Sequence, residues 1–134
     1  MVESIGLDIV DMDRLARSWE RFGDRLLQRV LTLAERERFA RRRDALAYLA
    51  GRFAAKEATI KAMGAFVPPP VRLNEISVEN RPDGSPLVRP PERLAELFAR
   101  RRLHVSLSHS HSAAAAVVIV EQLEQVRSDA PANR

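Results

Sequence analysis

The chain has 134 residues, 46% of them hydrophobic, which suits one compact domain with a buried core and leaves little room for two. It contains no cysteine, which excludes disulfides, thiolate zinc sites and a cysteine nucleophile. The net charge is +4 and the pI about 10.5, and of the 22 basic residues only Lys56 and Lys61 are lysine. An arginine-rich surface suits phosphate groups or an acidic protein partner, although a solvated face is the simpler interpretation of most single arginines.

The N-terminal stretch MVESIGLDIVDMD carries acidic residues where a secretory signal would carry basic residues and then an apolar run. No apolar run approaches the roughly 20 residues that a helix needs to span a bilayer. We therefore expect a cytoplasmic protein that does not bind a membrane.

The chain is predicted to open with one strand and one helix. Residues 4–10, SIGLDIV, are short and β-branched and predict a strand that ends near Asp8. Apolar residues at helical intervals predict a helix over residues 11–22, and Gly23 can break it before the helical pattern resumes over residues 26–30.

Two further helices are expected in the first half. Thr32 and Glu35 have the spacing of a capping box, which predicts that a helix begins there. Asp44 is a candidate cap for a long helix, DALAYLAGRFAAKEATIKAMG, which Gly64 is expected to end.

The second half is predicted to be rich in strands. Three consecutive prolines at residues 68–70 exclude a regular element. EISVEN and PLVRP then predict two strands joined by a turn at Asp83 and Gly84, and PERLAELFARRR predicts a short helix with Pro91 near its start. HVSLSH and AAAAVVIVEQ predict a final hairpin.

Helices that come early and strands that come late predict the α+β class, with helices packed on one small, mainly antiparallel sheet. The N-terminal strand has to join that sheet, which would bring Asp8 close to the C-terminal half. We expect one domain over residues 1–123 and a disordered tail over residues 124–134.

The long helix carries the first candidate site. Glu57 and Lys61 are four residues apart and share one helix face, where an exposed ion pair worth about 0.3–0.5 kcal/mol is the simplest interpretation. The alanines around them let other elements approach closely, so a buried carboxylate would need a partner. One candidate is Mg²⁺ shared between Glu57 and Asp8, because Mg²⁺ takes one or two protein carboxylates with water and phosphate oxygens. For Asp8, capping of the following helix is the competing interpretation.

The predicted strand HVSLSH carries the second candidate site. Strand alternation places His104, Ser106 and Ser108 on one face, where they suit a phosphate or a hydroxyl-bearing ligand, or form an ordinary wet face. His109 and His111 have no recognisable third zinc ligand, and the sequence has no GxSxG nucleophile elbow.

Three segments together, IGLDIVDMDRL at 5–15, RFAAKEATIKAMG at 52–64 and HVSLSHS at 104–110, resemble the bacterial holo-[acyl-carrier-protein] synthases, which are phosphopantetheinyl transferases. The match extends from about residue 4 to residue 120, and a KEAxxKA core with an upstream GxD is specific to this superfamily. The resemblance implies the phosphopantetheinyl transferase fold and a Mg²⁺-dependent reaction of fatty-acid biosynthesis. In that reaction phosphopantetheine passes from coenzyme A to a serine of apo acyl carrier protein, and adenosine 3′,5′-bisphosphate is released.

The resemblance also implies residue roles. Asp8 and Glu57 match the metal carboxylates of the family, and Lys61 matches the lysine that contacts the phosphates. The positions that match the coenzyme A site are Arg52, Lys61, Gly64, Pro86, His104 and Ser106. Arg14 matches an arginine that recognises the acidic carrier protein, and Arg17, Arg21 and Arg25 could extend that surface. Short synthases of this kind are homotrimers with sites shared between neighbouring chains.

Some roles stay open and some positions depart from the family. Attack by the serine needs a base, which is either Glu57 acting through a water or a water on the metal. Lys56, about 100° away around the helix, could hold Glu57 or the far phosphates of the nucleotide. The family commonly continues with Thr-Gly after KAMG, where this chain has Ala65 and Phe66, and Ser85 stands where a lysine is usual.

Two other functions fit parts of the sequence. A nucleic-acid-binding module suits the high pI, but it predicts exposed aromatic residues or a docking motif, and the single Trp and Tyr stand at helical positions expected to face inward. A metal-dependent phosphohydrolase would use the same carboxylates to activate water, and would release free phosphopantetheine.

Overall fold

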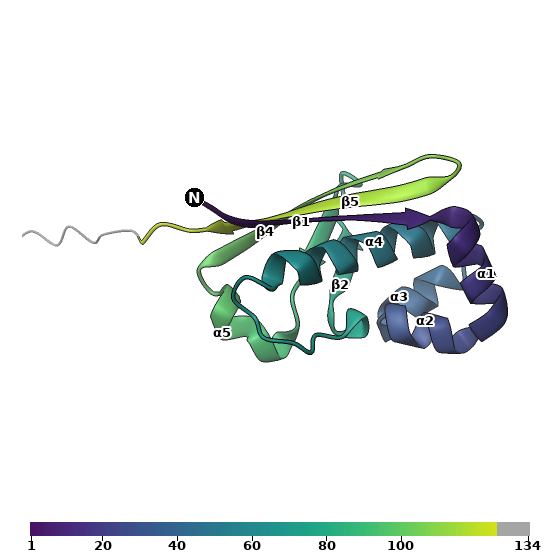
Figure 1. The fold of residues 1–134 in the computed structure, drawn as a ribbon, viewed down its shortest axis with the longest axis horizontal. Helices are drawn as coiled ribbons and strands as arrows, with labels where there is room; N and C mark the ends of the chain where they lie inside the picture. The colour runs from purple at the N-terminus through teal and green to yellow at the C-terminus, as the bar shows by residue number, and fades with distance from the viewer. Residues whose placement is uncertain (126–134) are drawn as a thin grey trace, which may run out of the picture.

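The computed structural model describes residues 1–125, and residues 126–134, which hold most of the predicted disordered tail, lie outside the described part. A three-stranded sheet lies over one long helix, with smaller elements below it (Figure 1). The elements in chain order are β1 (Val2–Asp11), α1 (Met12–Phe22), α2 (Asp24–Val30), α3 (Leu33–Phe39), α4 (Ala45–Met63), the 3₁₀ helix η1 (Leu73–Glu75), β2 (Ser77–Asn80), β3 (Pro86–Arg89), the 3₁₀ helix η2 (Glu92–Leu94), α5 (Ala95–Phe98), β4 (Arg101–His109) and β5 (Ala113–Gln122).

The α+β class is confirmed, with every strand pair antiparallel. The N-terminal strand joins the C-terminal hairpin as expected, in the order β1-β5-β4, with Asp8 opposite Ala116. The strands β2 and β3 differ from the prediction of one sheet, because they form a separate two-stranded sheet. Prolines at 86, 90 and 91 bracket β3 and lack the N–H group that a further ladder would need.

Helix α4 lies against the inner face of the three-stranded sheet (Figure 1). Its alanines 50, 54, 55, 58 and 62 are fully buried, so the backbones of the helix and the sheet come close together. The approach is closest at Gly6, where an added Cβ would lie 1.9 Å from the Ala58 carbonyl oxygen. The Ser4 hydroxyl donates to the Ala62 carbonyl at 2.7 Å on the same line of contact. This packing fixes the position of β1 on α4, and therefore the position of Asp8.

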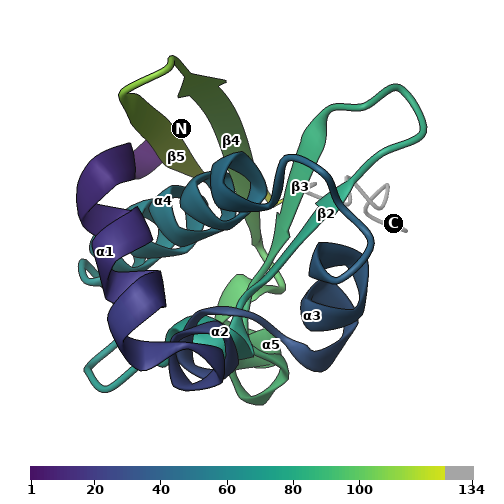
Figure 2. The same ribbon diagram turned by 90° about the vertical axis from the view of Figure 1, so that its right-hand side faces the viewer.

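Helices α1, α2 and α3 form a group at one end of α4 (Figure 2). The cap of α1 is Asp11, whose side chain accepts from the Arg14 N–H at 2.8 Å, so the interpretation of Asp8 as the cap is wrong. The predicted break at Gly23 is confirmed, since its φ of 54° ends α1. The predicted capping box at Thr32 and Glu35 is also present.

The ends of α4 agree only partly with the prediction. Asp44 precedes the helix, but its side chain makes no capping bond, because both carboxylate oxygens bind the Arg42 guanidinium at 2.7 Å. Gly64 follows the last helical residue, as expected. The predicted helix after Pro91 is shorter than expected and consists of η2 and α5.

The Trp and the Tyr face inward, as predicted. The Trp19 ring meets the Phe39 ring edge to face at a centroid distance of 5.1 Å, and Tyr48 is buried. Within residues 1–125, no helix has both the length and the hydropathy that crossing a bilayer requires.

Candidate active site

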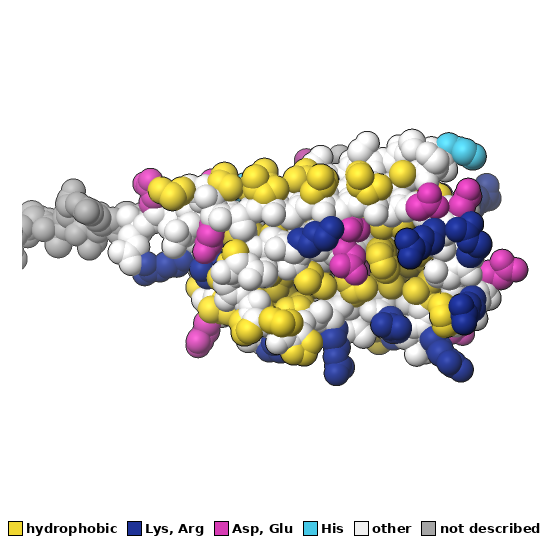
Figure 3. Space-filling view, in the orientation of Figure 1, with side chains coloured by type: hydrophobic (Ala, Val, Ile, Leu, Met, Phe, Trp, Pro, Cys, Tyr) yellow, Lys and Arg dark blue, Asp and Glu magenta, His cyan; other side chains and the backbone are white. Residues whose placement is uncertain are grey.

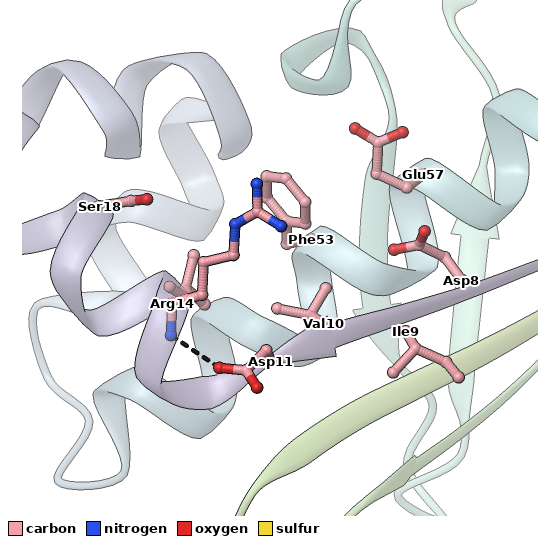
Figure 4. Close-up of a pocket in the computed structure, with 9 residues that line it drawn as sticks. Asp8, Ile9, Val10, Asp11, Arg14, Ser18, Phe53 and Glu57 are labelled. Carbon is pink, nitrogen blue, oxygen red and sulfur yellow. Dashed lines mark hydrogen bonds between the residues drawn. The ribbon is translucent and has the colours of Figure 1, made fainter.

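Asp8 and Glu57 line the same cavity, which has a volume of about 490 Å³. Their carboxylates reach it from β1 and α4, while Arg14 and Ser18 point toward it from α1 (Figure 4). The approach at Gly6 explains why, since it holds the middle of β1 against the turn of α4 that carries Glu57. The full set of lining residues is Asp8, Ile9, Val10, Asp11, Arg14, Leu15, Ser18, Phe53 and Glu57.

Lys61 lies at the edge of this carboxylate pair. Its Nζ is 3.1 Å from Asp8 Oδ1 and donates to the Leu7 carbonyl at 2.9 Å. The simplest interpretation of the sequence, an ion pair between Lys61 and Glu57 on one helix face, is therefore wrong. Among the described residues, the ion-pair partner of Lys61 is Asp8 on the neighbouring strand. The side chain of Asp8 is mostly buried and that of Lys61 is about half exposed, so the ammonium faces the solvent side of the pair.

The electrostatics of the pair favour a cation. Partial burial raises the pKa of Glu57, the Asp8 carboxylate raises it further, and the Lys61 ammonium offsets part of this. Two carboxylates held close together attract a cation that compensates their repulsion. Residues 1–125 contain no cluster of three or more His, Cys, Asp or Glu side chains that could hold a metal ion. Two carboxylates beside open space fit Mg²⁺, which completes its shell with water and phosphate oxygens.

Arg52 lies on the same helix as Glu57 but lines different cavities. It is only 7% exposed, its guanidinium stacks 4.3 Å above the Tyr48 ring, and its Nη2 donates to Asn80 Oδ1 at 3.3 Å. With Arg38 and Arg42 it lines a cavity of about 300 Å³. The Arg52 Nε and the Tyr48 hydroxyl are buried without a protein partner among the described residues. The unsatisfied donors and the nearby Arg38 suit an anion, although the Arg42 guanidinium is paired with Asp44 and the Glu79 carboxylate also lines this cavity.

The other predicted coenzyme A residues also lie away from the Asp8 cavity. His104 and Ser106 stand on the exposed face of β4, as the alternation predicted, and His104 Nε2 is 3.3 Å from Glu121 Oε1. Gly64 is exposed at the end of α4, and Pro86 begins β3. A single chain therefore brings together Asp8, Glu57 and Lys61, with Gly64 one turn beyond Lys61 at the end of α4, while Arg52, Pro86, His104 and Ser106 do not line the cavity of Asp8 and Glu57.

Lys56 is placed differently from the prediction. Its side chain is fully buried, where its Nζ donates to the Val30 carbonyl at 2.6 Å and pairs with the Glu35 carboxylate. It therefore faces neither Glu57 nor a nucleotide. An acidic partner 21 residues upstream could not be recognised from spacing along one helix.

The four arginines predicted to contact a partner lie on α1 and α2. Arg14, Arg17, Arg21 and Arg25 are all exposed. Arg14 also lines the cavity of Asp8 and Glu57, so the basic surface begins at the carboxylate pair.

The family model described as the 4′-phosphopantetheinyl transferase superfamily matches residues 4–119. The chain belongs to this superfamily. A holo-[acyl-carrier-protein] synthase from Nitratidesulfovibrio vulgaris is 43% identical over 124 residues, which cover 90% of this chain and 99% of that protein.

Solved structures of the superfamily agree. The holo-[acyl-carrier-protein] synthase from Neisseria meningitidis has 31% sequence identity and a TM-score of 0.83, over 91% of this chain and all of that chain. The Helicobacter pylori synthase, solved in complex with coenzyme A, has 31% identity and a TM-score of 0.75, over 87% of this chain and 99% of that chain.

Sequence reasoning missed several residues that line the two cavities. Ser18 and Phe53 line the cavity of Asp8 and Glu57, and Arg38 and Arg42 lie beside Arg52. Phe53 shares the helix face of Glu57, which was a usable signal. Nothing in the sequence pattern distinguished Arg38 and Arg42 from the other arginines, because their meeting with Arg52 depends on how α3 packs on α4.

Proposed function

We propose that this transferase moves 4′-phosphopantetheine from coenzyme A to a serine hydroxyl of an apo acyl carrier protein. The observation that carries the proposal is that Asp8 and Glu57 meet at one cavity from two elements far apart in the chain, with Lys61 paired to Asp8 beside them. The serine oxygen forms a bond to the β-phosphorus of coenzyme A, the bond from that phosphorus to the bridging oxygen breaks, and adenosine 3′,5′-bisphosphate leaves.

Asp8, Glu57 and Lys61 each have a role in this step. Asp8 and Glu57 would hold Mg²⁺, which when bound neutralises charge on the pyrophosphate. Lys61 presents its ammonium beside them and suits a phosphate oxygen. The raised pKa of Glu57 makes its carboxylate more basic than an ordinary glutamate, so it holds a cation or a proton more strongly.

We assign coenzyme A binding to Arg52, Lys61, Gly64, Pro86, His104 and Ser106. The stacked, nearly buried guanidinium of Arg52 supports a phosphate contact, because its Nε has no protein partner among the described residues and Arg38 lines the same cavity. His104 and Ser106 are exposed on the far face of the sheet from α4. The simplest arrangement that brings them to a site with Glu57 is one shared between two chains, in which His104 and Ser106 of one chain face Glu57 of its neighbour.

We further propose that the protein is a homotrimer. Ile5, Leu7 and Ile9 are each more than half exposed and stand in a row along β1. Figure 3 shows hydrophobic side chains continuing along this edge of the molecule. Val117 and Ile119 on β5 lie opposite Leu7 and Ile5 and extend the row across the sheet. An apolar sheet face of this kind marks a protein interface.

Replacing Ile5 with glutamate is expected to split the oligomer, because it places a charge in the apolar sheet face. Size-exclusion chromatography with light scattering should show a trimer for the wild type and a monomer for Ile5→Glu, with transfer activity lost in parallel. Leu33→Glu is the matched control, because Leu33 is similarly exposed (67% against 62%) but lies on α3. A wild type that is monomeric and fully active would contradict the shared site.

Reversing the charge of Arg14 is expected to weaken binding of the carrier protein. We propose that Arg14, Arg17, Arg21 and Arg25 receive an acidic helix of the carrier, and a reversed charge there repels it. Steady-state kinetics of Arg14→Glu should show the KM for carrier raised about tenfold or more, a loss of about 1.4 kcal/mol, with the KM for coenzyme A within twofold of wild type. Equal changes in both constants would contradict the assignment.

Product analysis separates transfer from hydrolysis. The protein is incubated with coenzyme A and Mg²⁺, first alone and then with an apo acyl carrier protein. We expect adenosine 3′,5′-bisphosphate to appear only when carrier is present. Release without carrier, together with free phosphopantetheine, would instead establish the phosphohydrolase.

The nucleic-acid alternative is weakened because Trp19 and Tyr48 face inward. The cytoplasmic location stays a prediction.

A further inference from the structure

Lys56 and Glu35 form a buried ion pair for which the proposed reaction has no use. Both side chains are fully buried, and the pair joins α4 to α3. Burial lowers the pKa of Lys56, and the carboxylate of Glu35 offsets part of this. Removing a charged pair from water costs desolvation energy, so stability alone does not explain why this pair lies in the core.

Each charged atom of the pair holds a different piece of backbone. Lys56 Nζ donates to the Val30 carbonyl at 2.6 Å. Glu35 Oε1 accepts from the Thr32 N–H at 2.8 Å, and Glu35 Oε2 accepts from the Val78 N–H at 2.9 Å. The network therefore ties the connection between α2 and α3, and the strand β2, to the helix that carries Glu57.

The end of α2 depends on Lys56 more than the other elements do. Val30 is the last residue of this seven-residue helix, so its carbonyl has no partner within the helix. A helix this short has little stability of its own, and a cation at its C-terminus is favourable. The strand β2, in contrast, keeps its ladder to β3 from Ser77 to Asn80 when Glu35 is lost.

Asp8 and Glu57 have an independent anchor, because Gly6 and Ser4 pack β1 directly on α4. Loss of Lys56 would thus leave the carboxylates in place and remove one of the contacts that hold α2. Helix α2 carries Arg25 and continues through Gly23 into α1, which carries Arg14, Arg17 and Arg21. Because α1 packs directly on α4 and β1, the arginine that would move with α2 is Arg25.

We propose that Lys56 is a positioning residue for the protein substrate: by holding the end of α2 on α4, it sets α2 and its Arg25 at a fixed distance from Glu57. The inference rests on the proposed transferase function. It places Lys56 in carrier recognition, without contact with the carrier, coenzyme A or the reacting atoms.

The test compares three variants of the full chain with the wild type. Lys56→Met removes the contact with Val30 and leaves Glu35 unpaired. The double variant Lys56→Met with Glu35→Leu removes both charges, so it avoids the unpaired buried carboxylate of the single variant, although the Thr32 and Val78 N–H groups lose their acceptor. Arg93→Met is the matched control, because it breaks an exposed ion pair with Glu75 and neither residue lies on α1, α2 or α4.

Thermal melting and steady-state kinetics are measured for each variant. We expect the double variant to melt below the wild type, because the Val30 carbonyl and the Thr32 and Val78 N–H groups lose their partners, and to keep a cooperative transition. Its KM for apo acyl carrier protein should rise about tenfold, and its KM for coenzyme A should stay within twofold. Arg93→Met should match the wild type in both constants. A stably folded double variant with both constants unchanged, or with both raised equally, would overturn the proposal. An inactive wild type would instead overturn the transferase function on which it rests.

Discussion

Replacing Glu57 with glutamine is expected to lower the kcat of transfer about a thousandfold, or about 4 kcal/mol in the barrier. The amide keeps the shape of the side chain but loses the charge that, with Asp8, would hold Mg²⁺ beside the pyrophosphate. Glu37→Gln is the matched control, because Glu37 is an exposed glutamate on α3 and should leave the rate unchanged. A Glu57→Gln enzyme within tenfold of wild type would remove Glu57 from the site.

The same substitution is expected to stabilise the metal-free protein. The pKa of Glu57 is raised in the folded state, so the folded state favours the protonated form, and the charged carboxylate destabilises it at neutral pH. The stability of the metal-free wild type should therefore fall as the pH rises above the ordinary pKa of glutamate, through the raised value. At pH 7 without metal, Glu57→Gln should have the higher melting temperature.

Magnesium should reverse that order. A cation that binds only the folded state stabilises it by mass action, so millimolar Mg²⁺ should raise the melting temperature of the wild type and leave that of Glu57→Gln unchanged. This measurement reports on metal binding without any transfer reaction. Equal shifts in the two proteins would contradict the assignment of Glu57 as a metal ligand.

Replacing Gly6 with alanine is expected to cost about 3 kcal/mol or more of folding free energy. The added Cβ would lie 1.9 Å from the Ala58 oxygen and 2.8 Å from the Ala62 nitrogen. Both contacts are backbone atoms of α4, which cannot rotate away, so β1 has to move off the helix. Asp8 moves with β1, and the activity should fall further than the loss of stability alone explains.

Gly51→Ala is the control for Gly6→Ala. Gly51 lies in the same helix, where an added Cβ would meet nothing within 4 Å. Alanine there should stabilise the protein by about 0.5–1 kcal/mol, because glycine is a poor helix former. Chemical denaturation measures both variants against the wild type. Similar stability for the two would show that the close approach at Gly6 is not needed.

The sequence predicted most of the elements because these depend on local patterns. Periodicity located α4 and the final hairpin. Asp8 and Glu57 were proposed from the resemblance of the GxD and KEAxxKA motifs to a known family, and the structure places both at one cavity. Gly6 was recognised only as part of a motif. Its physical reason, the approach of β1 to α4, appears only once the strand and the helix are packed.

The rest depended on contacts between distant elements. Periodicity placed Lys61 beside Glu57, but the strand β1 offers Asp8 as a better partner for its ammonium. From the sequence, Lys56 is expected to contact either Glu57 or the far phosphates of the nucleotide. Instead, the packing of α3 on α4 buries it against Glu35. Asp44 likewise lost its capping role to a competing bond with Arg42. In each case the competing partner comes from outside the predicted element.

The intact mass of an apo acyl carrier protein tests the central claim most directly. The carrier is incubated with coenzyme A, Mg²⁺ and either the wild type or Glu57→Gln, with a parallel wild-type sample in EDTA. The account predicts a gain of one phosphopantetheine with the wild type and no gain with Glu57→Gln or EDTA. An undiminished gain with Glu57→Gln and in EDTA would show that transfer does not depend on the carboxylate pair. No gain with the wild type, while coenzyme A still binds, would contradict the transferase function itself.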